Sequence, residues 1–361
     1  MIMIEGWLLD VHENEVGTGM LAWVVDDAGK AHACPVPWYP SLHVHASVDE
    51  LDRLEHWLEQ PEIILRFGLL NVRTTRARLD LEMRHHSEVL EVSLRSFRNL
   101  RGLAEHIEAR GDFHRFKLYS VDAHLAQRFL NDHGCVPFGR VRWSPDNPER
   151  FEPVVGFEPR ETYPAFRAVK LEVDSVQDHG FPDLNDTVAC FRLSTVLEPG
   201  FEAPTARPSI NIEREHYASM KAMLSAFQSA INALDPDIVL SVGGDQRWFP
   251  WLVEQSRVHQ QSLFLGRTQD ALEQTTHQRT VHSYGQTRHR HGAFFLKGRL
   301  HFDVRNSFIV NEGGLAGLFE LAQHSRQSAQ VISRLSPGSE ISANTVSYTH
   351  LRAHETDSHL V

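Results

Sequence analysis

One carboxylate, Asp245, stands in a setting that is typical of functional sites. It follows the apolar run Ile238–Val242 and two glycines, Gly243 and Gly244. The run predicts a buried strand, and residues just beyond the carboxyl end of a strand commonly form the site of an α/β domain. No Lys-Ser or Lys-Thr pair follows the glycines, so the pattern matches a nucleotide-phosphate loop poorly.

The segment 278–305 is a second candidate, because it is strongly basic in an otherwise acidic chain. Cationic side chains follow phosphates and aromatic rings stack on bases, and here both types are interleaved with histidines. We therefore predict contact with single-stranded nucleic acid. A solvated hairpin whose aromatic residues alternate into the core explains the pattern equally well. The predicted nucleic-acid-binding residues are Arg279, Arg288, Arg290, Lys297 and Arg299.

The elements that position these residues can be read from the second half of the chain. A helix is predicted between residues 220 and 234, where apolar side chains recur on one face. Asp235-Pro236-Asp237 ends this helix and leads directly into the strand that precedes Asp245. Residues 166–173 and 187–193 predict adjacent strands of a meander.

The first half of the chain predicts a mixed α+β unit over residues 1–143. Gly6–Val11 and Met20–Val25 are strand candidates, and Ser47–Leu58 predicts a helix that begins with a capping box. The segment Trp143–Pro148 breaks the pattern with two prolines, so we predict a domain boundary near it.

Composition limits the class of protein. The 361 residues include 36 Lys and Arg against 47 Asp and Glu, which gives a net charge of −11, so the whole chain is not an electrostatic binder of nucleic acid. Its 3 cysteines form no CxxC pair, which argues against a disulfide framework and favours a reducing cytoplasm. No apolar run approaches the roughly 18 residues of a membrane span.

The run Asp235–Leu252 resembles the second exonuclease motif of family B DNA polymerases. In that family, Asp-Pro-Asp and an apolar strand precede a Gly- or Asn-containing turn, an Asp and Pro-Tyr-Leu. Three further blocks agree with the family in order and spacing. They are Phe116–Leu130 with Gly134–Pro137, Leu296–Asp303, and Glu320–Arg326 with Ser333–Gly338.

The resemblance implies an α/β and α+β fold, with a mixed N-terminal domain (1–143), a linker (144–165) and a ribonuclease-H-like 3′–5′ exonuclease domain (166–335). Residues 336–345 would begin the connection to a polymerase palm. Residues 346–361 depart from the family, and we expect them to be a read-through tail. No polymerase carboxylate motif is found, so we expect the chain to be roughly the first half of a larger enzyme, unable to synthesise DNA unaided.

The resemblance also implies metal-dependent hydrolysis. Such chemistry needs several carboxylates to hold paired Mg²⁺ or Mn²⁺ ions about 3.5–4 Å apart. The family's first motif is Asp-x-Glu on a strand, whereas the matching strand here offers Glu172 and Asp174 in reversed order. Residues two apart on a strand share a face, so both carboxylates can converge. Their exchanged lengths displace each oxygen by about one C–C bond, which is enough to impair catalysis.

The other two exonuclease motifs depart further. The metal-binding Asp of the second motif aligns with Trp248, so Asp245 would have to substitute for it. The third motif, Tyr-x-x-x-Asp, falls on Asn311–Leu315, which contains neither residue. We therefore expect an inactive exonuclease with Glu172, Asp174 and Asp245 as remnants of its catalytic set. Glu172 and Asp174 would bind Mg²⁺ or Mn²⁺ only if the site were active; otherwise no cofactor is expected.

Three hypotheses follow. The first is the N-terminal and exonuclease region of a cytoplasmic family B DNA polymerase, with single-stranded primer or template DNA and a polymerase domain in cis as its partners, and no membrane. The second is a stand-alone, non-catalytic nucleic-acid-binding scaffold of the same fold. The third is an active nuclease that uses Glu172, Asp174 and Asp245.

Overall fold

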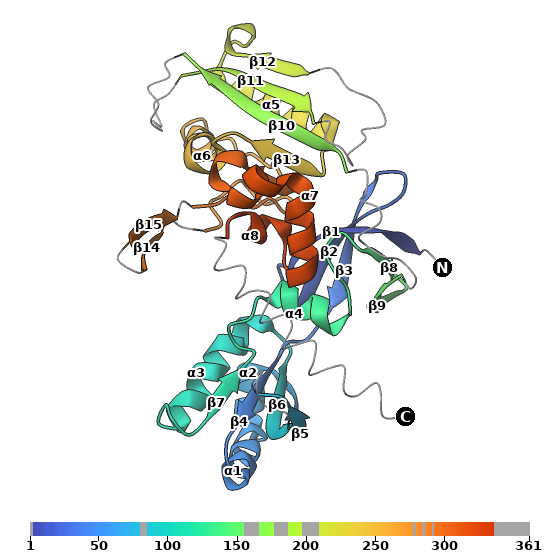
Figure 1. Cartoon of the computed structure of the whole chain (residues 1–361), viewed down its shortest axis with the longest axis vertical. Helices are drawn as coiled ribbons and strands as arrows, with labels where there is room; N and C mark the ends of the chain where they lie inside the picture. Colours follow the sequence, from blue (N-terminus) through green and yellow to red (C-terminus); the bar gives the residue numbers. More distant parts are fainter. Residues whose placement is uncertain are drawn as a thin grey trace.

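The computed structural model describes residues 3–79, 85–154, 166–176, 187–196, 209–276, 279–283, 286–290 and 292–335. Within these ranges the chain forms a mixed α/β structure with eight α-helices, three larger sheets and one two-stranded hairpin. The three sheets follow one another along the long axis of the molecule (Figure 1). None of the helices in the described ranges is long and apolar enough to cross a membrane.

The middle sheet is formed by strands from both ends of the first 153 residues. Its order is β3-β2-β1-β8-β9. The strands are β1 (Ile4–Glu13), β2 (Gly19–Val25), β3 (Ala31–Pro37), β8 (Arg140–Ser144) and β9 (Asn147–Pro153). Helix α4 (Leu125–Asp132) buries Phe129 and Leu130 in a core with this sheet. The predicted strands Gly6–Val11 and Met20–Val25 are confirmed as parts of β1 and β2.

The segment 144–165 was predicted as a linker, but its first part contains a strand. Residues 147–153 form β9, which pairs with β8 through a tight turn. Pro145 and Pro148 predicted a break. Pro145 lies in the turn before β9, and Pro148 lies in β9, the outer strand of its sheet, where a missing backbone N–H leaves no ladder partner unsatisfied. Residues 155–165 lie outside the described part of the chain.

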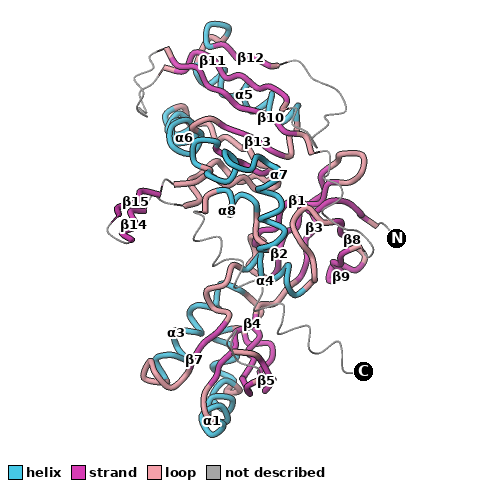
Figure 2. Tube along the Cα trace, viewed as in Figure 1, coloured by secondary structure: helices cyan, strands magenta, loops and turns pink. Residues whose placement is uncertain are grey.

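A second sheet lies at one end of the long axis of the molecule (Figure 2). Its order is β5-β6-β4-β7. The strands are β4 (Ser41–His45), β5 (Leu69–Ala77), β6 (Ser87–Leu94) and β7 (Lys117–Tyr119), and the helices α1 (Val48–Leu58), α2 (Pro61–Phe67) and α3 (Leu100–Arg110) contribute to the same core. The predicted helix at Ser47–Leu58 is confirmed as α1, which begins with the predicted capping box.

The third sheet carries the candidate site, and its order is β12-β11-β10-β13-β16. Its strands are β10 (Ala168–Ser175), β11 (Val188–Thr195), β12 (Ile210–Glu213), β13 (Ile238–Ser241) and β16 (Leu300–Asp303). The first three form an antiparallel meander, of which β10 and β11 were predicted and β12 was not, and β13 and β16 run parallel to β10. The parallel strands therefore end at one edge, which is where the polar residues that follow them meet.

Helices cover both faces of this third sheet. One face packs on α5 (Met220–Leu234) and α6 (Phe249–Val258). The other packs on α7 (Phe308–Ser325) and α8 (Ala329–Ser333), in a core that also includes Leu9, Trp23 and Val25 of the middle sheet. The same core includes Phe138 stacked on Phe319, with 3.8 Å between ring centroids. The middle and third sheets therefore share one continuous apolar interior.

Buried ion pairs fix the turn between α5 and β13. Helix α5 ends at Asp235, whose φ of 41° lies in the left-handed region that non-glycine residues seldom adopt. Its carboxylate pairs with Arg267 at 2.8 Å and Arg299 at 3.1 Å. Asp237 is fully buried, pairs with Arg267 at 2.7 Å and accepts a hydrogen bond from the backbone N–H of Arg167 at 2.8 Å.

We predict that Asp237→Ala lowers the free energy of unfolding by about 3 kcal/mol or more, because it leaves buried donors unpaired. Asp27→Ala is the control, since Asp27 is mainly exposed in its pair with Arg140 and should contribute about 1 kcal/mol or less. Urea unfolding followed by circular dichroism measures both, and equal losses would contradict the structural role of the buried pair.

Candidate functional site

A cleft of about 260 Å³ opens at the carboxyl ends of β10 and β13. This is the position at which the sequence predicted a site. The cleft brings together residues from the end of β10, the turn after β13 and the turn after β16. They are Glu172, Val173, Asp174, Ser175, Val242, Arg247, Trp248 and Arg305.

Glu172 and Asp174 line this cleft together, but each is already paired with a cation of its own sheet. The Glu172 carboxylate lies 2.8 Å from the ammonium of Lys170, two residues earlier on β10. The Asp174 carboxylate lies 2.9 Å from the guanidinium of Arg192 on β11. The side chain of Glu172 is 34% exposed and that of Asp174 is 50% exposed. Water therefore screens both ion pairs, and each contributes little to stability.

Asp245 does not line the cleft with them. Its side chain is fully buried, and both carboxylate oxygens are engaged. Oδ1 accepts a hydrogen bond from the backbone N–H of Phe294 at 3.0 Å. Oδ2 accepts from Arg334 Nε at 3.0 Å and from Asn306 Nδ2 at 2.8 Å. The carboxylate is therefore neutralised by Arg334, the C-terminal cap of α8, and it does not line the cleft.

The electrostatics of this buried group follow from its partners. Burial by itself raises the pKa of Asp245, but the positive charge of Arg334 and hydrogen bonds from Arg334 and Asn306 outweigh it and lower the pKa. Burial acts in the opposite direction on the neighbouring His301, where it lowers the pKa of the ring. The Nδ1 of His301 lies 2.7 Å from the Phe294 carbonyl and 3.1 Å from Arg334, and its Nε2 lies 2.7 Å from the Ser241 hydroxyl.

The turn that carries Asp245 is held by a second carboxylate, which the sequence did not indicate as important. Asp303, at the end of β16, accepts hydrogen bonds from the backbone N–H groups of Gly243 at 2.8 Å and Asp245 at 2.9 Å. Gly243 has a φ of 77°, which favours glycine. A signal was available in the sequence, since an Asp that ends a parallel strand lies at the same sheet edge as the Gly-Gly-Asp turn.

Cations occupy the cleft where the family resemblance implied carboxylates. Trp248, the residue aligned with a metal-binding Asp, is buried and packs beneath the guanidinium of Arg247, 4.3 Å from its ring centroid. Arg247 also donates to the Ser175 hydroxyl at 3.2 Å. Arg305 is exposed and forms no ion pair with any described residue. Arg305 is the last residue of the predicted basic segment 278–305 but was not among its predicted binding residues, and Arg247 was not predicted at all.

The segment aligned with the third motif lies in α7. Residues 311–313 are exposed, and the helix is interrupted at Gly314, whose φ of 64° and ψ of −166° are not helical. No Tyr or Asp stands there to face the strands. Only a glycine accommodates this backbone without strain, so the pair Gly313-Gly314 in the sequence is consistent with a break in the helix.

The described residues do not fit a pair of divalent cations. A two-metal site needs several carboxylates with free oxygens around one point, whereas here two are paired with Lys170 and Arg192 and the third is buried against Arg334. Among the described residues, one cluster has metal-ligand spacing, namely Glu213, Glu215 and His216. It lies at the turn after β12 and shares no residue with the cleft.

The basic segment is divided by the fold. Arg279, Arg288 and Arg290 lie on a hairpin of β14 (Arg279–Ser283) and β15 (Gln286–Arg290), in which Arg279 is the cross-strand partner of Arg290. The hairpin projects from the body of the molecule (Figure 1). Lys297 is partly exposed and lies 2.9 Å from Asp270.

Arg299, which the sequence also placed in this nucleic-acid strip, is 3% exposed. Its guanidinium donates to the carbonyls of Pro236, Leu265 and Gly266 and pairs with Asp235, so it belongs to the buried cluster described above. Its place in the interior follows from β16, which begins one residue later at the centre of the fold.

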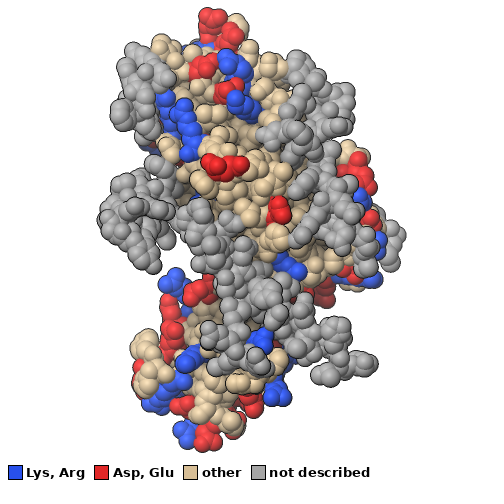
Figure 3. Space-filling view, in the orientation of Figure 1, with Lys and Arg blue, Asp and Glu red and all other residues tan. Residues whose placement is uncertain are grey.

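Charge on the visible surface is mixed in sign. Lys and Arg are interspersed with Asp and Glu over the lobe formed by α1, α3 and β5–β7 (Figure 3). This face of that lobe therefore offers no extended field of one sign.

No protein-family model and no curated protein sequence matches the chain. A solved structure does: the family B DNA polymerase from the hyperthermophilic archaeon Pyrobaculum calidifontis superposes with a TM-score of 0.72 over 97% of this chain, at 16% sequence identity. The chain spans about half of that polymerase, 51% of its length. The fold is therefore similar to that of part of a family B DNA polymerase, as the sequence motifs predicted.

We predict that Asp245→Asn lowers the free energy of unfolding at pH 7 by about 2 kcal/mol or more. The amide is uncharged, and its N–H₂ group must face either the donors Arg334 and Asn306 or the donating backbone N–H of Phe294. The folded pKa of Asp245 is lowered, so this stabilisation is present above the unfolded pKa of about 3.9 and is lost as the pH falls through the folded pKa.

Urea unfolding at pH values between about 2.5 and 7 measures the effect. The difference between wild type and variant should shrink below about pH 4. Asp49→Asn, at an exposed position in α1, is the control. A difference that stays constant with pH would contradict the ionised, arginine-paired state of Asp245.

Proposed function

We propose that this chain is the N-terminal and exonuclease-type region of a family B-type DNA polymerase, and that it holds single-stranded DNA without cleaving it. The fold supports this assignment over 97% of the chain. The sheet order, with three antiparallel strands followed by two parallel ones and helices on both faces, is also what a ribonuclease-H-like domain requires. DNA synthesis itself would depend on a polymerase domain joined in cis.

One observation carries the non-catalytic part of the proposal. The edge at which a metal-dependent exonuclease assembles its carboxylates has Arg247 and Arg305 beside Glu172 and Asp174 in the cleft, while Asp245 is buried against Arg334. Divalent cations are repelled by guanidinium groups and need free carboxylate oxygens. Phosphate groups, by contrast, are attracted to arginine. The cleft is therefore better suited to hold a strand than to hydrolyse it.

The hairpin of β14 and β15 provides the second part of the proposed DNA contact. It carries Arg279, Arg288 and Arg290 away from the body of the protein, where a flexible strand is accessible. Arg and Lys that neutralise phosphates release condensed counterions, which makes such binding strongly dependent on salt. The dependence of binding on salt therefore distinguishes a hairpin that contacts phosphates from a hairpin with a purely structural role.

The first prediction concerns cleavage. Purified protein with Mg²⁺ or Mn²⁺ should not shorten a 5′-labelled single strand from its 3′ end, because the carboxylates of the described part of the cleft are paired with cations and form no set that holds the ions. A denaturing gel over a time course is the measurement. Asp174→Ala should give the same result as wild type. Metal-dependent shortening that Asp174→Ala abolishes would favour the alternative, an active nuclease that uses Glu172 and Asp174.

The second prediction concerns binding. Arg288→Glu with Arg290→Glu should weaken binding of single-stranded DNA by about tenfold or more and flatten the dependence of log K on log salt, since two phosphate contacts are replaced by repulsion. Fluorescence anisotropy at several salt concentrations measures both quantities. Arg53→Glu with Arg76→Glu, at exposed positions of the α1 and β5 lobe, is the charge-matched control. Equal effects of the two double variants would rule out the hairpin as a specific contact.

A further inference from the structure

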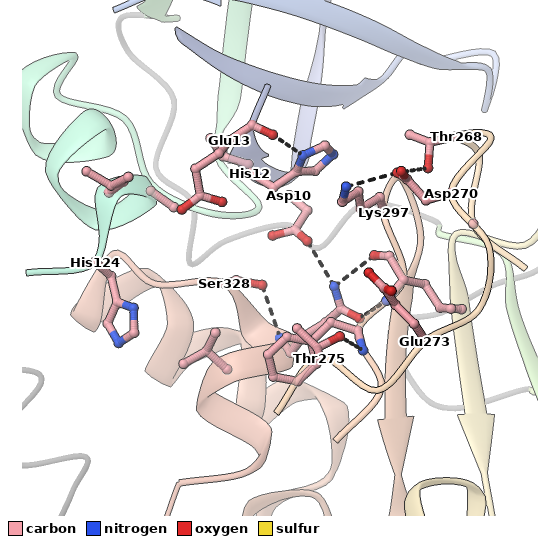
Figure 4. Close-up of a pocket in the computed structure, with 18 of the residues that line it drawn as sticks. Asp10, His12, Glu13, His124, Thr268, Asp270, Glu273, Thr275, Lys297 and Ser328 are labelled. Atoms are coloured by element: carbon pink, nitrogen blue, oxygen red, sulfur yellow. Dashed lines mark hydrogen bonds and ion pairs between the residues drawn. The ribbon is translucent and has the colours of Figure 1, made fainter. Parts of the chain in front are cut away.

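A pocket of about 350 Å³ lies where β1, the N-terminal turn of α4, α8 and the loops around residues 265–275 and 295–297 meet (Figure 4). No described residue lines both this pocket and the cleft at the ends of β10 and β13. Its volume is within the range of small-molecule sites in proteins. Its walls come from segments far apart in the sequence, so the pocket is formed only in the folded chain.

Acidic side chains dominate the charged part of the lining. Among the described residues, four carboxylates (Asp10, Glu13, Asp270 and Glu273) line the pocket against one lysine, Lys297. The ammonium of Lys297 lies 2.9 Å from the Asp270 carboxylate, so these two charges balance each other. Glu13 and Glu273 are exposed, and neither carboxylate forms a hydrogen bond or an ion pair with a described residue. Two negative charges of the lining are therefore left without a counter-charge from the described part of the chain.

Asp10 belongs to the wall of the pocket and adds no charge that a ligand can reach. The residue is 6% exposed, its Oδ2 accepts a hydrogen bond from Gln330 Nε2 at 3.0 Å, and its Oδ1 is buried. Burial also raises the pKa of its carboxyl group. The negative charges that face a ligand are therefore those of Glu13 and Glu273.

These two glutamates reach the pocket from different elements. Glu13 is the last residue of β1, and Glu273 lies in the loop between α6 and β14. Figure 4 shows them on opposite sides of the pocket. A single compact cation can meet one of these carboxylates, whereas a ligand that meets both needs a positive group at each end.

Much of the remaining wall is apolar, which limits the chemistry of such a ligand further. A chain of methylene groups gains free energy by packing on an apolar wall, whereas a hydrated metal ion gains nothing from it. The main apolar lining residues are Val11, Leu125, Leu265, Leu272, Phe295 and Val331.

The N-terminal turn of α4 acts against a cation in this pocket. Leu125, Ala126 and Gln127 of this turn are part of the lining. A helix N-terminus has the effect of roughly half a positive charge. The two full charges of Glu13 and Glu273 exceed it, so the lining as a whole still favours a positive ligand.

We propose that this pocket binds a linear aliphatic diamine or polyamine, with one ammonium group at Glu13, another at Glu273 and the methylene chain on the apolar wall. The two carboxylates require two positive groups, and the wall favours a hydrocarbon chain between them. Exposed ion pairs are individually weak, so binding depends on meeting both carboxylates at once. The site shares no described residue with the cleft or the β14–β15 hairpin, so it does not depend on the proposed contact with DNA.

Isothermal titration calorimetry of the full chain with putrescine, cadaverine and the monoamine butylamine measures this preference. At about pH 8 an ordinary histidine is neutral and an aliphatic ammonium group stays charged, so His12 and His124 of the lining do not compete with the ligand. Wild type should bind at least one of the diamines about fivefold more tightly than butylamine, which corresponds to one additional ion pair of the stronger exposed kind.

Glu13→Gln and Glu273→Gln should each lower the affinity for that diamine to the level of butylamine, because one of its two ammonium groups then has no carboxylate. Glu108→Gln, the same change at an exposed position of α3, should keep the preference of wild type. Both pocket glutamates are exposed, so the variants should fold, and thermal unfolding confirms this.

Three results would overturn the proposal. Equal affinities of wild type for the diamines and butylamine would mean that a single ammonium group suffices, as on a lysine side chain of a protein partner. A preference for diamines that survives in both pocket variants would place the binding elsewhere on this acidic chain. Displacement of the diamine by an equal concentration of Mg²⁺ would show a charge effect to which the apolar wall contributes nothing.

Discussion

The buried pair of Asp245 and Arg334 is the interaction on which the site depends. Arg334 is 9% exposed at its side chain and Asp245 is fully enclosed, so neither charge can be hydrated if the other is removed. Through this pair and Asn306, the turn after β13 is tied to the turn after β16 and to the end of α8. The same carboxylate accepts from Phe294, which fixes the chain that leaves the β14–β15 hairpin.

This pair also determines the chemistry that the sheet edge can perform. A carboxylate that balances a buried arginine cannot at the same time bind a cation in the cleft. Removing Asp245 from the cleft leaves Arg247 and Arg305 beside Glu172 and Asp174, whose charges are balanced by Lys170 and Arg192. Guanidinium groups at this edge favour phosphate over divalent cations, which is the basis of the proposed role in holding a strand.

Helix α8 also joins the two larger bodies of the molecule. Gln330 contacts Asp10 of the middle sheet and the backbone of Leu296 and His301 of the third sheet. A side-chain amide suits this place because it can donate and accept at once, satisfying groups on both sides of the interface. The apolar core that includes Trp23 and Phe319 lies beside it. A pocket of about 350 Å³ lies at this junction, so its geometry depends on how the two sheets are docked.

The sequence by itself determined the local elements and the similarity of fold. Helical spacing over 220–234, the capping box before α1 and the order of the motifs all depend on residues that are near one another in the chain, and the structure agrees with them. Only the tertiary structure decided the charge state and accessibility of individual side chains. Arg299, read as a surface cation, is buried, and Asp245, read as a remnant ligand, is paired with a residue 89 positions later. Burial and pairing depend on contacts between distant segments, which local pattern does not encode.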